Sequence, residues 1–86
     1  MGWIMHELGV LRQVVKTVSR AAEQNRIGRV KYVALEVGRS SGFVPRYLTK
    51  LFPVAADSCA LLKNAQLTLS LVPGSGLVIK EIGYER

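Results

Sequence analysis

The stretch Arg29-Val30-Lys31-Tyr32-Val33-Ala34-Leu35-Glu36-Val37 decides how the rest of the chain can fold. It consists largely of β-branched, aromatic and aliphatic residues without a helical stripe, which is typical of a strand. Alternate residues of a strand project to opposite faces. One face would carry Val33, Leu35 and Val37, and the other would carry Tyr32, Ala34 and Glu36. We therefore expect a strand that is buried on one face and partly covered on the second.

A helical pattern precedes this strand, from about Met5 to Gln24. Apolar residues recur there at spacings of three and four, at Leu8, Leu11, Val14, Val15, Val18, Ala21 and Ala22. Three basic residues recur every four positions on another face, which we expect to be solvated: Arg12, Lys16 and Arg20. Asn25 and Gly28 then supply typical signals for the end of a helix.

A second helix is predicted after the strand. Gly38-Arg39-Ser40-Ser41-Gly42 breaks the strand, and Pro45 suits a first helical turn because its missing N–H would be unpaired there anyway. An apolar stripe follows, at Tyr47, Leu48, Leu51, Phe52, Ala55 and Cys59. Pro53 lies inside that stripe and should kink the helix or end its first half near Leu51.

The last third of the chain predicts two more strands. In the first, leucines alternate with polar residues from Leu67 to Leu71. The second runs from Leu77 to Tyr84, with Leu77 and Ile79 on one face and Val78, Lys80 and Ile82 on the other. Because only Pro73-Gly74-Ser75-Gly76 separates the two runs, we expect them to form a hairpin.

The order α-β-α-β-β indicates an α+β fold in a small two-layer domain. A strand–helix–strand segment is parallel and right-handed when its strands are neighbours, whereas the hairpin would be antiparallel. The simplest arrangement that buries the apolar stripes is a three-stranded mixed sheet with two helices on one face. With 86 residues and 9.5 kDa, residues 1–86 are expected to form one domain.

Composition excludes several classes of protein. Hydrophobic residues make up 49% of the chain and charged residues 21%, which favours a compact core over disorder. A single cysteine excludes an internal disulfide and a four-cysteine zinc site. No apolar run approaches the ~20 residues of a membrane span, and the first residues are neither a secretory nor a myristoylation signal. We expect a cytoplasmic protein.

The sequence offers no common catalytic constellation, which argues against an enzyme. The chain has one histidine and one cysteine, far apart in sequence, and its serines lack a partner placed to activate them. His6-Glu7 is the pair of most interest. On spacing alone, Glu7 would simply favour the first turn of its helix through the helix dipole, beside a solvated His6. A metal site usually needs more ligands than one imidazole and one carboxylate.

Basic residues outnumber acidic ones by 12 to 6, for a net charge of +6. Nucleic acid could use them as phosphate contacts, but the strands lack interleaved aromatic residues that would stack on bases. A solvated face, or a surface that meets an acidic protein, is the interpretation we favour.

Four segments, taken together, are similar to a known family. They are Met5-His6-Glu7-Leu8-Gly9-Val10, Leu35-Glu36-Val37-Gly38 with Ser41-Gly42-Phe43-Val44-Pro45, Leu61-Leu62-Lys63-Asn64-Ala65-Gln66-Leu67, and Ile79-Lys80-Glu81-Ile82. In this order and spacing they resemble the HypA/HybF family of hydrogenase nickel-incorporation proteins, from Met5 to about Tyr84.

The resemblance implies a nickel-binding α/β domain. Such proteins are metallochaperones that deliver nickel to the large subunit of [NiFe] hydrogenase, often together with a maturation GTPase. In the family the Met-His-Glu start supplies nickel with a terminal amine, backbone nitrogens and an imidazole, a planar nitrogen set that suits Ni(II). The resemblance therefore points to His6 as ligand, with Met5 and Glu7 contributing backbone nitrogens. The hydrogenase subunit or the GTPase would be the partner, and a homodimer is an option.

The sequence departs from the family pattern in three places. Met1-Gly2-Trp3-Ile4 precedes the motif, so that the nitrogen of Met5 is an amide, which yields its proton to a metal less readily than an amine. Arg39 stands where members of the family usually carry an acidic residue. Val44 stands where some members carry one. The family's zinc module, with its two Cys-x-x-Cys pairs, is missing between Pro73 and Leu77, so zinc is not expected.

These departures keep alternatives open. The leading hypothesis is a nickel metallochaperone for hydrogenase maturation. A second is a protein-interaction module of the same fold that has lost metal delivery. A basic nucleic-acid-binding domain is the third.

Overall fold

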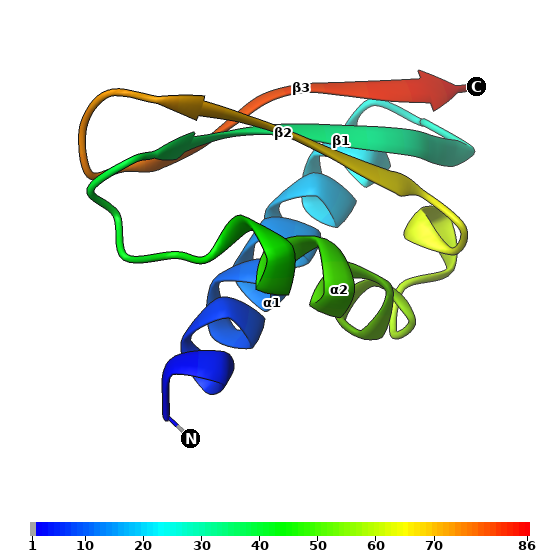
Figure 1. The fold of residues 1–86 in the computed structure, drawn as a ribbon. Helices are drawn as coiled ribbons and strands as arrows, with labels where there is room; N and C mark the ends of the chain where they lie inside the picture. Colours follow the sequence, from blue (N-terminus) through cyan, green and yellow to red (C-terminus); the bar gives the residue numbers. More distant parts are fainter. Residues whose placement is uncertain (1) are drawn as a thin grey trace.

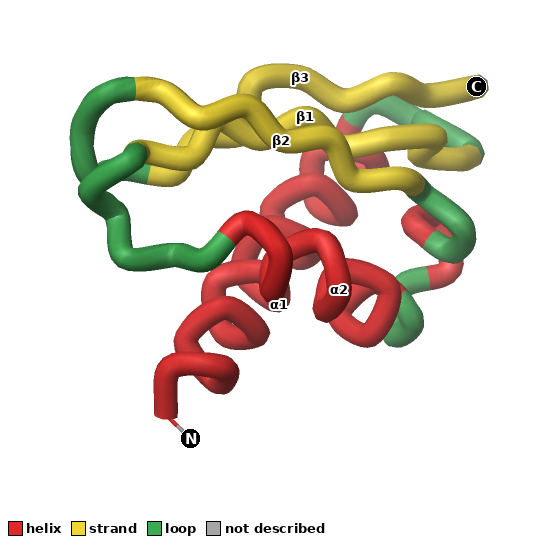
Figure 2. Tube along the Cα trace, in the orientation of Figure 1, coloured by secondary structure: helices red, strands yellow, loops and turns green. Residues whose placement is uncertain are grey.

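Two helices cover one face of a three-stranded sheet, as predicted (Figure 1). The structure, a computed structural model, describes residues 2–86, and the side chains of residues 6–86. Its elements are α1 (Gly2–Gln24), β1 (Arg29–Gly38), α2 (Pro45–Ala56), the short 3-10 helix η1 (Ala60–Leu62), β2 (Gln66–Val72) and β3 (Leu77–Glu85). Figure 2 shows the helices as one layer below the strands, with loops joining the layers at both ends.

The core lies between these two layers and contains the predicted apolar stripes. Its buried side chains are Leu11, Val14, Val15, Val18 and Ala22 of α1, Ile27, Val30, Val33, Leu35 and Val37 around β1, and Leu48, Phe52, Ala55, Ala56 and Leu62. Fully burying one aliphatic or aromatic side chain of this kind contributes about 1.5–3 kcal/mol relative to leaving it exposed. The outer residues of β1 are only partly exposed, in agreement with the expected partial cover.

The predicted hairpin between the last two strands is wrong. The strand order is β2-β1-β3, so β1 lies between the two strands that the short connection joins. β1 pairs with β2 in parallel, from Tyr32 opposite Gln66 to Gly38 opposite Val72. It pairs with β3 in antiparallel fashion, with Val33 opposite Ile82 and Val37 opposite Leu77. A short connection is typical of a hairpin, but here it crosses the end of the central strand.

Gly38 makes this crossing possible. The end of β1 holds the connection through three backbone hydrogen bonds, which Gly38, Arg39 and Ser40 donate to carbonyl groups of the segment 72–76 at 2.7–2.9 Å. A Cβ atom on Gly38 would overlap the carbonyl oxygen of Gly74 and lie 2.9 Å from the nitrogen of Gly76. The neighbouring strands of a sheet lie about 4.8 Å apart, so the connection spans about 10 Å, within reach of four extended residues.

Three local features also differ from the predictions. A register irregularity beside Lys80 places Ile82 opposite Val33, on the core face, although it was predicted on the face of Val78 and Lys80. The first helix begins at Gly2 and not at Met5. The second continues through Pro53 to Ala56, so Pro53 does not end it near Leu51.

Candidate metal site

His6 lies on the second turn of α1 and faces the segment that leads into α2. The His6 side chain is exposed, and its ring stacks on the Phe43 ring with centroids 4.4 Å apart and planes 25° apart. One face of the imidazole is therefore packed, while the ring as a whole remains accessible from solvent. The exposure of His6 agrees with the simplest interpretation of the sequence, and the stack on Phe43 is an additional contact that this interpretation did not include.

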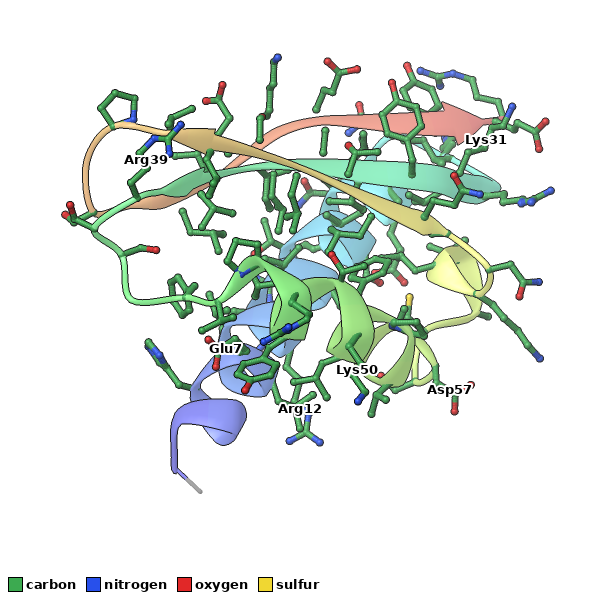
Figure 3. All side chains as sticks on the ribbon, viewed as in Figure 1. Glu7, Arg12, Lys31, Arg39, Lys50 and Asp57 are labelled. Atoms are coloured by element: carbon green, nitrogen blue, oxygen red, sulfur yellow. The ribbon has the colours of Figure 1, made fainter. Side chains whose placement is uncertain are left out.

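Glu7 is buried, which corrects the prediction of a carboxylate at the first helical turn. Its side chain is 1% exposed, and Oε2 accepts a hydrogen bond from the backbone N–H of Val44 at 2.8 Å. Val44 is the N-cap residue of α2 and makes no side-chain cap bond of its own. Glu7 thus satisfies a backbone donor at the start of α2 from a different helix. Figure 3 shows its carboxylate pointing into the gap below that segment.

The second carboxylate oxygen of Glu7 has no partner. Within the described part of the chain, Oε1 is the buried side-chain oxygen or nitrogen atom that lacks a hydrogen bond. A buried polar atom without a partner costs about 1–3 kcal/mol. The sequence did contain a signal for this burial, because Glu7 falls four residues before Leu11 and seven before Val14, on the apolar stripe of the helix.

The backbone nitrogens of His6 and Glu7 are engaged in the helix. Because α1 begins at Gly2, the N–H groups of His6 and Glu7 lie in helical register with the carbonyls of Gly2 and Trp3, four residues earlier. A metal that takes these nitrogens must displace their protons and open the first turn. In the helical conformation, the imidazole of His6 is therefore the nitrogen ligand that His6 and Glu7 can offer to a metal without a change of the backbone.

The other residues singled out by the sequence do not gather around His6. No group of three or more His, Cys, Asp or Glu side chains that could hold a metal ion exists among the described residues. Arg39 lies at the sheet end of the molecule, away from Glu7 (Figure 3). Cys59 is half-buried against the core, as expected of a small hydrophobic residue. Met5, which was predicted to contribute its backbone nitrogen, lies in α1. Its side chain is outside the described side chains.

Two solved structures share this architecture. A solution structure titled as the Ni metallochaperone HypA from Helicobacter pylori superposes with a TM-score of 0.72, at 15% identity, covering 87% of this chain and 70% of the other. A second solution structure of a HypA protein gives a TM-score of 0.68 at 17% identity, covering 90% and 71%. At these identities the likeness establishes the fold, a two-layer α/β domain of the type found in nickel metallochaperones.

The sequence comparisons identify the family. Residues 5–77 match the family described as "Hydrogenase/urease nickel incorporation, metallochaperone, hypA". The chain is 34% identical over 81 residues to the hydrogenase maturation factor HypA of Methanosarcina barkeri, covering 94% of this chain and 59% of that protein. It is 36% identical over 72 residues to the HypA protein of Geobacter sulfurreducens, covering 84% and 62%. This chain belongs to the HypA family.

The chain spans about three fifths of the length of these relatives. The described residues contain no helix that is both long enough and apolar enough to cross a membrane.

Proposed function

We propose that this chain is a nickel-binding module for hydrogenase maturation, which binds Ni(II) at the start of α1 and passes it on by protein docking. The observation that carries the proposal is the match of residues 5–77 to the nickel-incorporation family, beginning at the Met5-His6-Glu7 motif itself. The accessible imidazole of His6 at that position supports it. The module acts as a carrier and not as an enzyme.

Nickel capture proceeds from His6 into the backbone. The imidazole binds first, because it is a neutral nitrogen donor that needs no structural change. The amide nitrogens of His6 and Glu7, and that of Met5, become ligands once the first turn of α1 opens and their protons are lost. The bond from Val44 to Glu7 anchors the helix at Glu7, so that opening is confined to residues before Glu7.

Residues before Met5 oppose this capture in two ways. They make the nitrogen of Met5 an amide, and their carbonyls hold the N–H groups of His6 and Glu7 in the helix. A variant that begins at Met5 would present an amine with an ordinary pKa of about 8 and would free both amides. We therefore expect this variant to bind Ni(II) more tightly.

We propose that residues 1–86 form a single cytoplasmic domain in which Pro73–Gly76 replaces the zinc module implied by the family resemblance. The hydrogenase large subunit and a maturation GTPase are the proposed partners. The basic residues on α1 and α2 support docking on an acidic protein surface.

Calorimetric titration with Ni(II) tests the proposed site. His6→Ala should weaken binding by more than about tenfold, equivalent to about 1.4 kcal/mol. Glu23→Ala, at an exposed position of the same helix, should leave the affinity unchanged. If the parent chain and His6→Ala bind Ni(II) with equal affinity, His6 is not a ligand. If the variant that begins at Met5 binds Ni(II) no more tightly than the parent chain, the preceding residues do not oppose binding.

A second candidate function is metal-independent docking. The complete first turn of α1 favours it, because that turn engages the backbone nitrogens which nickel would require. A pull-down of the hydrogenase large subunit or the GTPase in the presence of chelator separates the two functions. Binding that persists in chelator supports metal-independent docking, and binding that disappears supports the nickel carrier.

A further inference from the structure

The positive charge of the protein is unevenly distributed. The strands carry three basic residues, Arg29, Lys31 and Lys80, and three carboxylates, Glu36, Glu81 and Glu85. The two long helices carry five basic residues, Arg12, Lys16, Arg20, Arg46 and Lys50, and two carboxylates, Glu7 and Glu23. Glu7 is buried under the loop before α2, so the accessible carboxylates of the helical layer are Glu23 and Asp57, the exposed C-cap residue of α2.

Carboxylates of the protein do not neutralise this charge. Among the side chains of residues 6–86, the ion pair that forms joins Arg29 to Glu85, at the far end of the sheet. All five basic residues of the helices are exposed. Figure 3 shows Arg12 and Lys50 extending from the helical layer on the side away from the sheet. Exposed, unpaired cations on one side of a molecule attract an oppositely charged partner.

A shallow groove of about 320 Å³ lies between α1 and the end of α2, beside these cations. Arg12 and Lys16 form one wall. The remaining lining residues have small side chains, and they are Val15, Ser19, Ala55, Ser58 and Cys59. Val15 and Ala55 are buried and close the floor. Small residues allow another backbone to approach closely, and the Ser19 hydroxyl lies along the edge. The Ser58 hydroxyl donates to the Ala55 carbonyl and can accept a further hydrogen bond.

We propose that this groove is the docking surface for an acidic α-helical segment of a partner protein. Arg12 and Lys16 are four residues apart, so their Cα atoms lie about 6 Å apart along the helix axis. Carboxylates spaced by four residues on a partner helix repeat at the same interval. A partner helix that lies along the groove would therefore place one carboxylate near each of the two cations. A face of small residues on that partner helix would contact Ser19, Ala55 and Ser58.

Duplex DNA fits this surface less well. The major groove is about 12 Å wide and admits one helix of about 10 Å. Because α1 and α2 pack side by side, a duplex would meet a face two helices wide and not a single protruding helix. The lining also lacks an aromatic side chain on which an unpaired base could stack. The observations thus favour an acidic protein.

The test uses the full 86-residue chain and a synthetic helical peptide of about 18 residues, with glutamates four positions apart and alanines between them. All measurements contain chelator, so the result is independent of nickel binding and of the proposed metal function. The peptide should bind, and its affinity should fall steeply with salt. Arg12→Gln combined with Lys16→Gln should weaken binding about fivefold or more at low salt.

The matched control is Lys31→Gln combined with Lys80→Gln, which removes the same charge from exposed positions on the strands. It should change the affinity less than twofold, about 0.4 kcal/mol. A second readout uses Cys59, the chain's single cysteine. Bound peptide should slow its alkylation by iodoacetamide, measured by intact mass.

Three outcomes would overturn the proposal. Equal weakening by the two double variants would assign binding to net charge alone. An unchanged rate of Cys59 alkylation at saturating peptide would place the peptide elsewhere. Tighter binding of a short duplex DNA than of the peptide, at the same ionic strength, would change the class of partner.

Discussion

Glu7 connects the Met5-His6-Glu7 motif to the second helix through a single hydrogen bond. Its Oε2 atom accepts from Val44 N–H, while Oε1 remains buried without a partner. We predict that Glu7→Ala lowers the free energy of unfolding by about 2 kcal/mol, because it leaves the cap donor of α2 unpaired and opens space under the loop. Urea denaturation measures this change. Glu23→Ala, exposed on the same helix, should change stability by less than about 0.5 kcal/mol. Equal midpoints for the two variants would contradict the capping role of Glu7.

Tyr32 illustrates an electrostatic effect on the outer face of the sheet. Its hydroxyl donates a hydrogen bond to Glu81 Oε2 at 2.6 Å. This bond, and then the negative charge of Glu81, raise the pKa of Tyr32 above its ordinary value of about 10. A raised pKa in the folded state means that the protonated phenol is stabilised there. The contribution to stability is therefore complete below pH 10 and is lost as the pH rises through the folded pKa.

We predict that Glu81→Gln moves the pKa of Tyr32 down toward its ordinary value, because the carboxylate charge disappears. The phenolate absorbance, followed during an alkaline titration, measures it in a background where Tyr47 and Tyr84 are replaced by Phe. Glu36→Gln, on the same face of the sheet, is the control and should leave the titration unchanged. A Tyr32 midpoint that does not move in Glu81→Gln would rule out this source of the shift.

At the scale of elements, the crossing of β1 by the connection 73–76 sets the sheet order. The prediction here is that Gly38→Ala destabilises the protein by about 2–3 kcal/mol, because the added methyl group meets backbone atoms of Gly74 and Gly76 that cannot rotate away. Gly76→Ala, in the same connection with open space at its Cβ position, should cost less than about 1 kcal/mol. Thermal unfolding compares them. If the two variants melt together, the connection does not press on β1 as described.

The sequence allowed the elements to be predicted better than their pairing. Periods of 3.6 and 2 identified both helices and all three strands, because each buries one continuous stripe against the other layer. The pairing of β2 and β3 was predicted wrongly, since a four-residue connection has the same length in a hairpin as in a crossing of one strand. The sequence predicts that Gly38 ends its strand, and in the structure the missing side chain of Gly38 permits the crossing.

The candidate site could be predicted only in part. The motif around His6 followed from the family resemblance, but the stack on Phe43 joins residues 37 positions apart, which no local pattern specifies. Glu7 was predicted as a favourable charge near the helix dipole, because a helix that begins near Met5 would place it in the first turn. Its spacing of four from Leu11 and seven from Val14 places it on the apolar stripe, and the prediction did not use this signal. The backbone N–H of Val44, which bonds to the buried carboxylate, belongs to the segment that leads into the other helix.

At the scale of the whole molecule, we expect the 86-residue chain to fold without zinc. The connection 73–76 is closed by three backbone hydrogen bonds from residues 38–40, and the core is continuous between both layers. Unfolding should therefore be a single cooperative transition with a stability on the order of 5 kcal/mol. Excess EDTA should leave the urea midpoint unchanged, and added Zn²⁺ should not raise it, because a ligand that stabilises must bind the folded state. The single cysteine offers a control: Cys59→Ser should respond to both reagents as the parent chain does. A midpoint that falls in EDTA and recovers with Zn²⁺ would show that the fold depends on a metal.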